Sequence, residues 1–137
     1  MEIVTVNRHA HFNAAHRLYN PDWDDERNEA VFGKCFNPKY HGHNYEMIVS
    51  VTGPVDPETG YVLDMKWLKD LIAERVEDYL DHKNLNEEVP EFAELNPTVE
   101  NIVILIWKRL KPALNPEFKL KVTLFETPRN FAEYNGS

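Results

Sequence analysis

Two long stretches of the chain alternate between apolar and polar residues, and this pattern limits the fold more than any other feature. The even positions of residues 3–16 are mostly apolar, and so are the odd positions of residues 41–52. A period of two residues puts one face of a β-strand against a core. The sequence therefore predicts two long strands in a sheet that is covered on one face.

The rest of the chain supplies two helices and two further strands. Residues 17–40 form a long acidic connection, and turn residues at 53–60 end the second strand. Apolar residues recur at helical spacing in 65–80, after the N-cap candidate Asp64, and from Pro97–Thr98 to before Pro112. We expect strands at 119–126 and 130–134. The order ββααββ predicts an α+β fold with an antiparallel sheet.

Composition excludes several classes of protein. The 137 residues suit one domain, and 15 Lys and Arg against 23 Asp and Glu give a formal net charge of −8. That charge disfavours nucleic acids and anionic membranes as partners. The single cysteine rules out an internal disulfide. The longest apolar run, 102–107, is too short to span a bilayer, and the N-terminus does not resemble a secretory signal, so we expect a cytoplasmic protein.

Three histidines lie on the apolar faces of the two long strands. His41 and His43 are two residues apart and leave the same face, and His16 shares a face with Phe12 and Ala14. Imidazoles that converge with one open position are typical of a catalytic zinc site. His16 alone fits a hydrogen-bonded core residue better, and for the pair both interpretations stay open. A second pair, His9 and His11, lies on the polar face and is read as solvated or as an inter-subunit contact.

Three further features carry possible chemistry, each with a simpler alternative. Cys35 lies in a turn-rich stretch and has two interpretations. It is either an inert small hydrophobic residue or a thiolate whose pKa is lowered by Lys34 and a metal. The pair Asp81–His82 fits a carboxylate that orients a histidine, or a histidine that suits a helix C-terminus. Glu126 continues the apolar face of a strand, so it needs a partner: Lys or Arg, or the paired N–H groups of a pterin or guanine.

Six short motifs, in order along nearly the whole chain, resemble the 6-pyruvoyl-tetrahydropterin synthase family, which includes the 6-carboxytetrahydropterin synthases of the queuosine pathway. Their order and spacing are highly specific, although no single motif is decisive. They are HFNAAHRLYN (11–20), FGKCFNPKYHGHNY (32–45), GPVDPETGYVLD (53–64), LDHKNLN (80–86), PTVEN (97–101) and TLFET (123–127).

The resemblance implies a fold and a reaction. The fold is the tunnelling fold, a four-stranded antiparallel sheet with two helices on one face, formed by residues 1–137 as one domain. Members form trimers whose sheets join into a barrel, two trimers stack into a hexamer, and the active sites lie between subunits. The reaction is the zinc-dependent conversion of 7,8-dihydroneopterin triphosphate to 6-pyruvoyl-tetrahydropterin with elimination of triphosphate.

The resemblance also implies roles for individual residues. By motif, the zinc ligands are His16, His41 and His43, the catalytic cysteine is Cys35 with Asp81 and His82 as its partners, the pterin anchor is Glu126, and Thr98 and Glu100 lie in the pterin-pocket segment.

The chain departs from the family pattern at a few positions. Asn13 and Ala15 replace serines that flank the first histidine, and Tyr40 stands where eukaryotic members have glycine, at the expected pocket rim. Five residues separate Cys35 from His41, as in pyruvoyl-forming members, whereas queuosine-pathway members typically have three.

Other functions compete with the pyruvoyl-forming reaction. The nearest is the 6-carboxytetrahydropterin synthase reaction, which releases acetaldehyde and triphosphate from the same substrate. A non-catalytic pterin- or zinc-binding protein is a different class, but it would need neither Cys35 nor the Asp81–His82 pair. The basic residues near the motifs are candidates for the triphosphate or simply solvated charges: Arg17, Lys34, Lys39 and Lys83.

Overall fold

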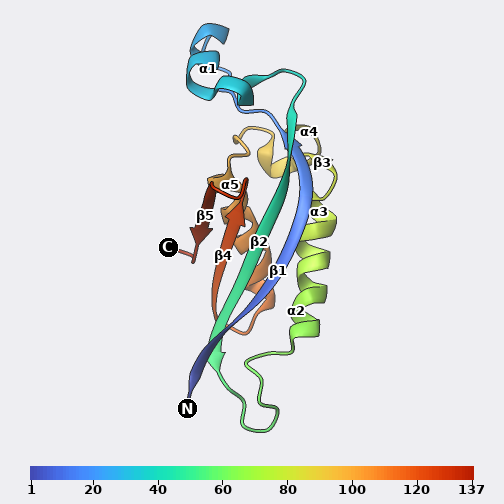
Figure 1. Cartoon of the computed structure of the whole chain (residues 1–137), viewed down its shortest axis with the longest axis vertical. Coiled ribbons are helices and arrows are strands. Elements are labelled where there is room, and N and C mark those ends of the chain that lie inside the picture. Colours follow the sequence, from blue (N-terminus) through green and yellow to red (C-terminus); the bar gives the residue numbers. More distant parts are fainter.

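The computed structural model describes all residues, 1–137, and contains one five-stranded sheet in the order β3-β1-β2-β4-β5. Two strands of equal length, β1 and β2, form its long twisted centre (Figure 1). The strands are β1 (Ile3–His16), β2 (His41–Pro54), β3 (Lys83–Asn84), β4 (Lys119–Phe125) and β5 (Phe131–Tyr134).

The two alternating stretches form the predicted strands and pair with each other. Their antiparallel register runs without a break from Ile3 opposite Pro54 to His16 opposite His41. The even-numbered face of β1 and the odd-numbered face of β2 turn toward the core. Phe12 and Tyr45, which are opposite each other in this register, are fully buried and stack with ring centroids 4.9 Å apart.

The prediction of a four-stranded, wholly antiparallel sheet is inexact. Four strands are antiparallel as expected, but β3 adds a fifth, pairing parallel with Ala14 and Ala15 of β1. With only two residues, β3 is too short to show a period-two pattern. It matters for the site because it directly follows Asp81 and His82.

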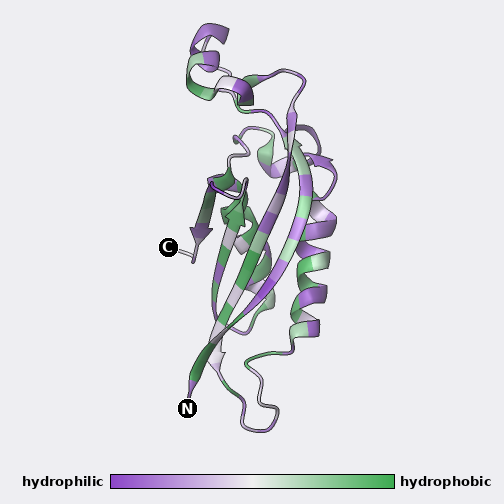
Figure 2. Ribbon diagram, viewed as in Figure 1, coloured by the Kyte–Doolittle hydropathy of each residue, from purple (hydrophilic) through white to green (hydrophobic).

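Two helical segments cover the core face of the sheet, and both were predicted. The first comprises α2 (Met65–Ile72), a π-helical turn (Ala73–Glu77) and α3 (Asp78–Leu80), and the second is α5 (Val99–Leu110). Asp64 and Thr98 cap α2 and α5 with their side chains. Figure 2 shows apolar residues alternating with polar ones along the long strands. No helix is long and apolar enough to cross a membrane.

The long acidic connection contains a helix that its sequence pattern does not reveal. Helix α1 (Asp25–Phe32) projects beyond one end of the sheet (Figure 1) and carries no apolar stripe. The side-chain amide of the buried Asn28 stabilises it locally by donating to the carbonyls of Asn20, Trp23 and Asp24. The remaining short elements are α4 (Leu85–Glu88) and 3-10 turns at Gly33–Phe36, Pro90–Phe92 and Lys111–Ala113.

Candidate active site and metal centre

The antiparallel register of β1 and β2 brings the three predicted metal ligands together. His16 is directly opposite His41, and His43 is two residues further along the same face of β2. Cross-strand neighbours on one face lie within side-chain contact, and the three ring centroids are 4.7 to 5.0 Å apart. One ligand atom from each ring falls within 4.8 Å of the other two. We call these three residues the histidine triad.

The nitrogen atoms of the triad have the arrangement of a metal site. Nδ1 of His16 lies 2.8 Å from the carbonyl oxygen of Pro97, so it carries the proton and Nε2 keeps a free lone pair. That Nε2 lies 3.2 Å from Nε2 of His41. Nε2 of His43 and Nδ1 of His41 are buried without a hydrogen-bond partner. Converging lone pairs and unpartnered buried nitrogens fit a divalent cation better than a purely structural cluster.

Burial favours the neutral form of two members of the triad, His16 and His41. It lowers the pKa of His16 to about 4, and the neighbouring His41 and His43 add to this effect. Burial and His43 also lower the pKa of His41. Neutral imidazole is the form that binds a metal.

Cys35 lies beside the triad, with its sulfur 3.7 Å from Nε2 of His41. Partial burial, followed by the negative charge of Glu126, raises the pKa of its thiol. Of the two alternatives for Cys35, the protein alone therefore does not favour the thiolate, and a nearby cation would have to reverse this shift of the pKa.

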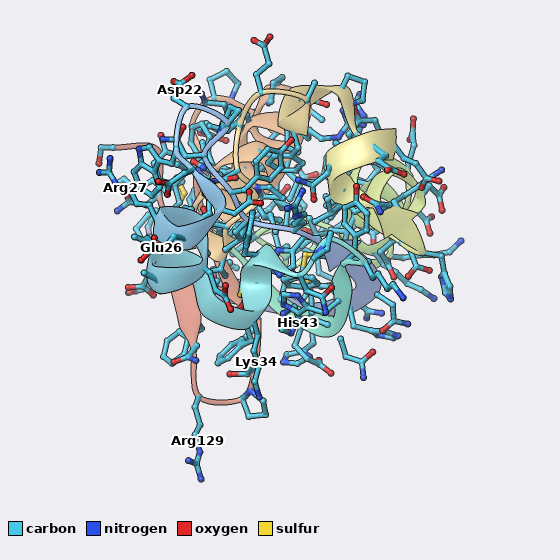
Figure 3. The ribbon with its side chains drawn as sticks, turned by 90° about the horizontal axis from the view of Figure 1, so that it is seen from above. Asp22, Glu26, Arg27, Lys34, His43 and Arg129 are labelled. Atoms are coloured by element: carbon cyan, nitrogen blue, oxygen red, sulfur yellow. The ribbon has the colours of Figure 1, made fainter.

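Glu126 directly follows β4, the strand that pairs with β2, and its side chain approaches the triad from there. Its Oε1 lies 3.8 Å from Nε2 of His43, and its side chain is 20% exposed. Neither lysine nor arginine lies within 4 Å of its carboxylate. The simpler alternative, an ion pair with Lys or Arg, is therefore not what the structure shows. Figure 3 looks onto this end of the molecule and labels His43.

Asp81 and His82 form their predicted contact, but neither makes a hydrogen bond with Cys35, whose only side-chain partner is His41. Nδ1 of His82 lies 2.9 Å from Oδ2 of Asp81, whose other oxygen accepts a hydrogen bond from the Asn13 amide. These hydrogen bonds, the Asn13 one foremost, lower the pKa of Asp81. The His82 side chain is 78% exposed and has a left-handed backbone, with φ 58°.

His82 lines an open pocket that one member of the triad, His43, also lines. Asn13, Ala15, Gly42 and Asn44 line it as well, and Cys35 does not. Asp81 and His82 are therefore free to contact a group other than the Cys35 side chain of their own chain.

The two weaker pterin-pocket candidates, Thr98 and Glu100, lie at the start of α5. The Thr98 hydroxyl accepts from the Asn101 amide and caps α5, and Glu100 is exposed in the first turn of that helix. The carbonyl of the preceding residue, Pro97, accepts from Nδ1 of His16, so this segment is connected to one member of the triad.

Sequence reasoning assigned no role at the triad to several groups that support it. The hydroxyl of Tyr45 lies 3.5 Å from Nδ1 of His16, and the backbone of Pro97 fixes the His16 ring. Arg17 stacks beside the Cys35 segment. The alternating pattern of β2 puts Tyr45 on the same face as the triad. The contact between the Pro97 carbonyl and His16 joins distant segments through the backbone, so a pattern of side chains cannot reveal it.

Comparison with known families matches this geometry. The sequence model of the family described as 6-pyruvoyl tetrahydropterin synthase matches residues 5–137. The chain is 44% identical to the Homo sapiens 6-pyruvoyl tetrahydrobiopterin synthase over 131 residues, which are 96% of this chain and 90% of that protein. It is 33% identical to a dihydroneopterin monophosphate aldolase of Pyrococcus furiosus over 112 residues, 82% of this chain and 79% of that protein.

Solved structures agree at the level of the fold. The Caenorhabditis elegans 6-pyruvoyl tetrahydropterin synthase superposes with a TM-score of 0.93 at 42% identity, covering 100% of this chain and 98% of that one. A Plasmodium vivax protein of the same name has a TM-score of 0.71 at 18% identity, with 98% of each chain covered, and supports the fold alone. The chain therefore belongs to the 6-pyruvoyl tetrahydropterin synthase family of lyases in pterin synthesis.

Proposed function

We propose that this chain is a zinc-dependent lyase that converts 7,8-dihydroneopterin triphosphate to 6-pyruvoyl-tetrahydropterin and triphosphate. One observation carries the proposal: the Cys35 sulfur lies 3.7 Å from Nε2 of His41, one of three histidines whose ligand atoms converge. A thiol beside such a triad is suited to proton transfer next to a metal. The curated relatives at 41–44% identity bear the name of this synthase.

The triad would hold the zinc. Three imidazoles supply the three protein ligands of a catalytic zinc site and leave the fourth coordination position for substrate. Bound there, zinc would act as a Lewis acid toward the hydroxyl oxygens of the substrate side chain and make the adjacent hydrogens more acidic.

Cys35 is the proposed base for the substrate side chain. Its sulfur is next to the position where that side chain would approach the triad, and a thiolate accepts a proton directly. His82, held by Asp81, handles a second proton transfer. The 2.9 Å contact fixes which ring nitrogen of His82 faces the carboxylate and leaves the other nitrogen for chemistry.

Glu126 is the proposed anchor for the pterin ring. A carboxylate without a cationic partner, near His43, can accept two N–H bonds from the 2-amino group and the ring nitrogen. Anchoring the ring there would place its side chain over the triad. We assign Thr98 and Glu100 to the same pocket, because Pro97 ties their segment to His16.

We further propose the tunnelling-fold hexamer, a dimer of trimers, with residues 1–137 as one domain and the active site shared between chains. Two features support a shared site. The His82 side chain is 78% exposed on its own chain, and the only side-chain hydrogen-bond partner of Cys35 there is His41. The outer edge of β1 is paired only at Ala14 and Ala15, which leaves most of a long strand open to a neighbour.

The experiment that tests the reaction is incubation of the zinc-loaded protein with dihydroneopterin triphosphate, followed by identification of the product by mass. We expect 6-pyruvoyl-tetrahydropterin and triphosphate. Formation of 6-carboxytetrahydropterin with acetaldehyde would contradict the assignment in favour of the queuosine-type reaction. Pterin binding without turnover would make the chain a binding protein.

A further inference from the structure

Arg17 directly follows the triad residue His16 and lies between two aromatic rings. Its guanidinium carbon is 4.4 Å from the centroid of Phe36 and 4.7 Å from that of Tyr19. The side chain is partly buried, and no carboxylate lies within 4 Å of it. Its surroundings are those of a stacked planar cation and not of a surface ion pair.

Residues 17 and 18 hold two successive carbonyls of the segment that carries Cys35. Nε of Arg17 donates to the carbonyl of Phe36 at 2.9 Å, and the amide of Leu18 donates to the carbonyl of Cys35 at 2.6 Å. The segment Gly33–Phe36 is a single 3-10 turn without a side-chain cap. Its position relative to β1 therefore depends on these bonds and on the stacking of Phe36.

The backbone of Arg17 is fixed by a different residue. The side-chain amide of Asn86 accepts from the Arg17 amide at 2.8 Å and donates to the Arg17 carbonyl at 2.9 Å. Both bonds survive any change of the Arg17 side chain. A substitution at this position thus loosens the Cys35 segment without releasing the backbone next to His16.

We propose that Arg17 is a positioning residue that holds the sulfur of Cys35 against the histidine triad. The proposal rests on the proposed role of Cys35 where turnover is concerned, but the position of the thiol does not depend on that role. The planar shape of the guanidinium is required, since one group must stack on Phe36 and bind its carbonyl at once. Lysine carries the same charge but has no planar group that could stack on the ring while its ammonium donates to the carbonyl.

The test uses Arg17→Lys, which keeps the charge, and Arg17→Gln, which removes it. Two measurements are made on zinc-loaded protein: kcat and KM for dihydroneopterin triphosphate, and the alkylation rate of Cys35 by iodoacetamide. Cys35 is the only cysteine, so the alkylation reports on one thiol. The matched control is Arg27→Lys, because Arg27 also stacks on a ring, that of Trp23 at 3.9 Å, but lies on α1 away from His43 (Figure 3).

We expect both Arg17 variants to keep their zinc and to lose about 10–100-fold in kcat with little change in KM, the cost of misplacing a reacting group by about an ångström. Alkylation of Cys35 should be faster in both, and the control should match the parent protein. Faster alkylation with normal turnover would support the positioning role and contradict the proposed base.

Other results would overturn the proposal. A raised KM with unchanged kcat in Arg17→Gln, restored in Arg17→Lys, would make Arg17 a binding residue for the triphosphate. An unchanged alkylation rate in both variants would show that Arg17 does not hold the segment. If neither variant folds, Phe36→Leu removes the stacked ring but keeps the carbonyl, and it should change both measurements in the same directions.

Discussion

At the scale of single residues, substitution of Glu126 has the most specific expected effect on pterin binding. Glu126→Gln keeps the shape of the side chain and loses its charge, so pterin binding should weaken by about 1.5–3 kcal/mol, the range for hydrogen bonds to charged groups. Zinc content should not change, because Glu126 is 3.8 Å from His43 and outside the triad. Calorimetric titration with a pterin and elemental analysis measure the two quantities.

A structural role for Glu126 would give a different pattern. The Glu126→Gln protein would then unfold at a lower temperature, and its folded fraction would bind the pterin normally. Thermal unfolding of the variant therefore separates the two roles.

Cys35 should be separable from the metal ligands by substitution. Cys35→Ala is expected to keep full zinc and to bind a pterin, since the three histidines suffice for the metal. It should lose turnover by several orders of magnitude, and Asp81→Asn should lose less because it removes only an orienting partner. Loss of zinc in Cys35→Ala would make the cysteine a ligand. Near-normal turnover would move the base to His82.

The buried His16 predicts a pH dependence of stability for the metal-free protein. Its pKa is about 4 when folded and near 6.5 when unfolded, so the unfolded chain binds more protons between these values. Stability should be complete above pH 6.5 and fall by about 3 kcal/mol toward pH 4. Denaturant unfolding with a chelator measures this slope, which should be shallower in His16→Asn. An equal slope in that variant would assign the effect to other groups.

Most of the candidate site was accessible from the sequence because period two fixes which residues share a face. The triad and Tyr45 follow from that rule once β1 and β2 pair. Glu126, whose carboxylate lies 3.8 Å from His43, follows from the same rule because it continues the alternation of β4. The position of Asp81 and His82 does not follow, because it depends on the two-residue β3 and on a left-handed backbone at His82.

At the scale of elements, the N-terminus of α5 links stability to the site. The Thr98 hydroxyl caps this helix by accepting from the Asn101 amide, so Thr98→Ala should lower the free energy of unfolding by about 1 kcal/mol. Thr98→Ser keeps the hydroxyl and should cost much less. Urea unfolding of the two variants checks this prediction. Equal losses would show that the methyl group matters and not the cap.

The elements that the sequence revealed are those that contact the core. Helices α2 and α5 bury one stripe and show it in their spacing. Helix α1 buries only Asn28, and its stability depends on the cap at Asp24 and on amide–carbonyl bonds within the connection. Such local polar contacts follow no hydrophobic period, so a pattern of apolar residues does not reveal them.

At the scale of the whole molecule, both edges of the sheet are open in the single chain. On β1, Ile3 is 63% exposed, and on β5, Phe131 is 55% exposed. Open strands with exposed apolar residues are unfavourable in a monomer. We therefore expect a hexamer, which light scattering at micromolar concentration measures. A monomer at that concentration would contradict the proposed assembly.

The proposal of an active site shared between chains has the most direct test of all, because Cys35 of one chain would act together with His82 of another. Cys35→Ala removes the first of these side chains and His82→Ala removes the second, and each variant protein alone should be nearly inactive. Mixing the two under conditions that exchange subunits should restore activity, toward about a quarter of the parent value, since random pairing joins two intact parts once in four. If the mixture stays as inactive as its components while mass analysis confirms mixed assemblies, Cys35 and His82 do not meet across a subunit boundary.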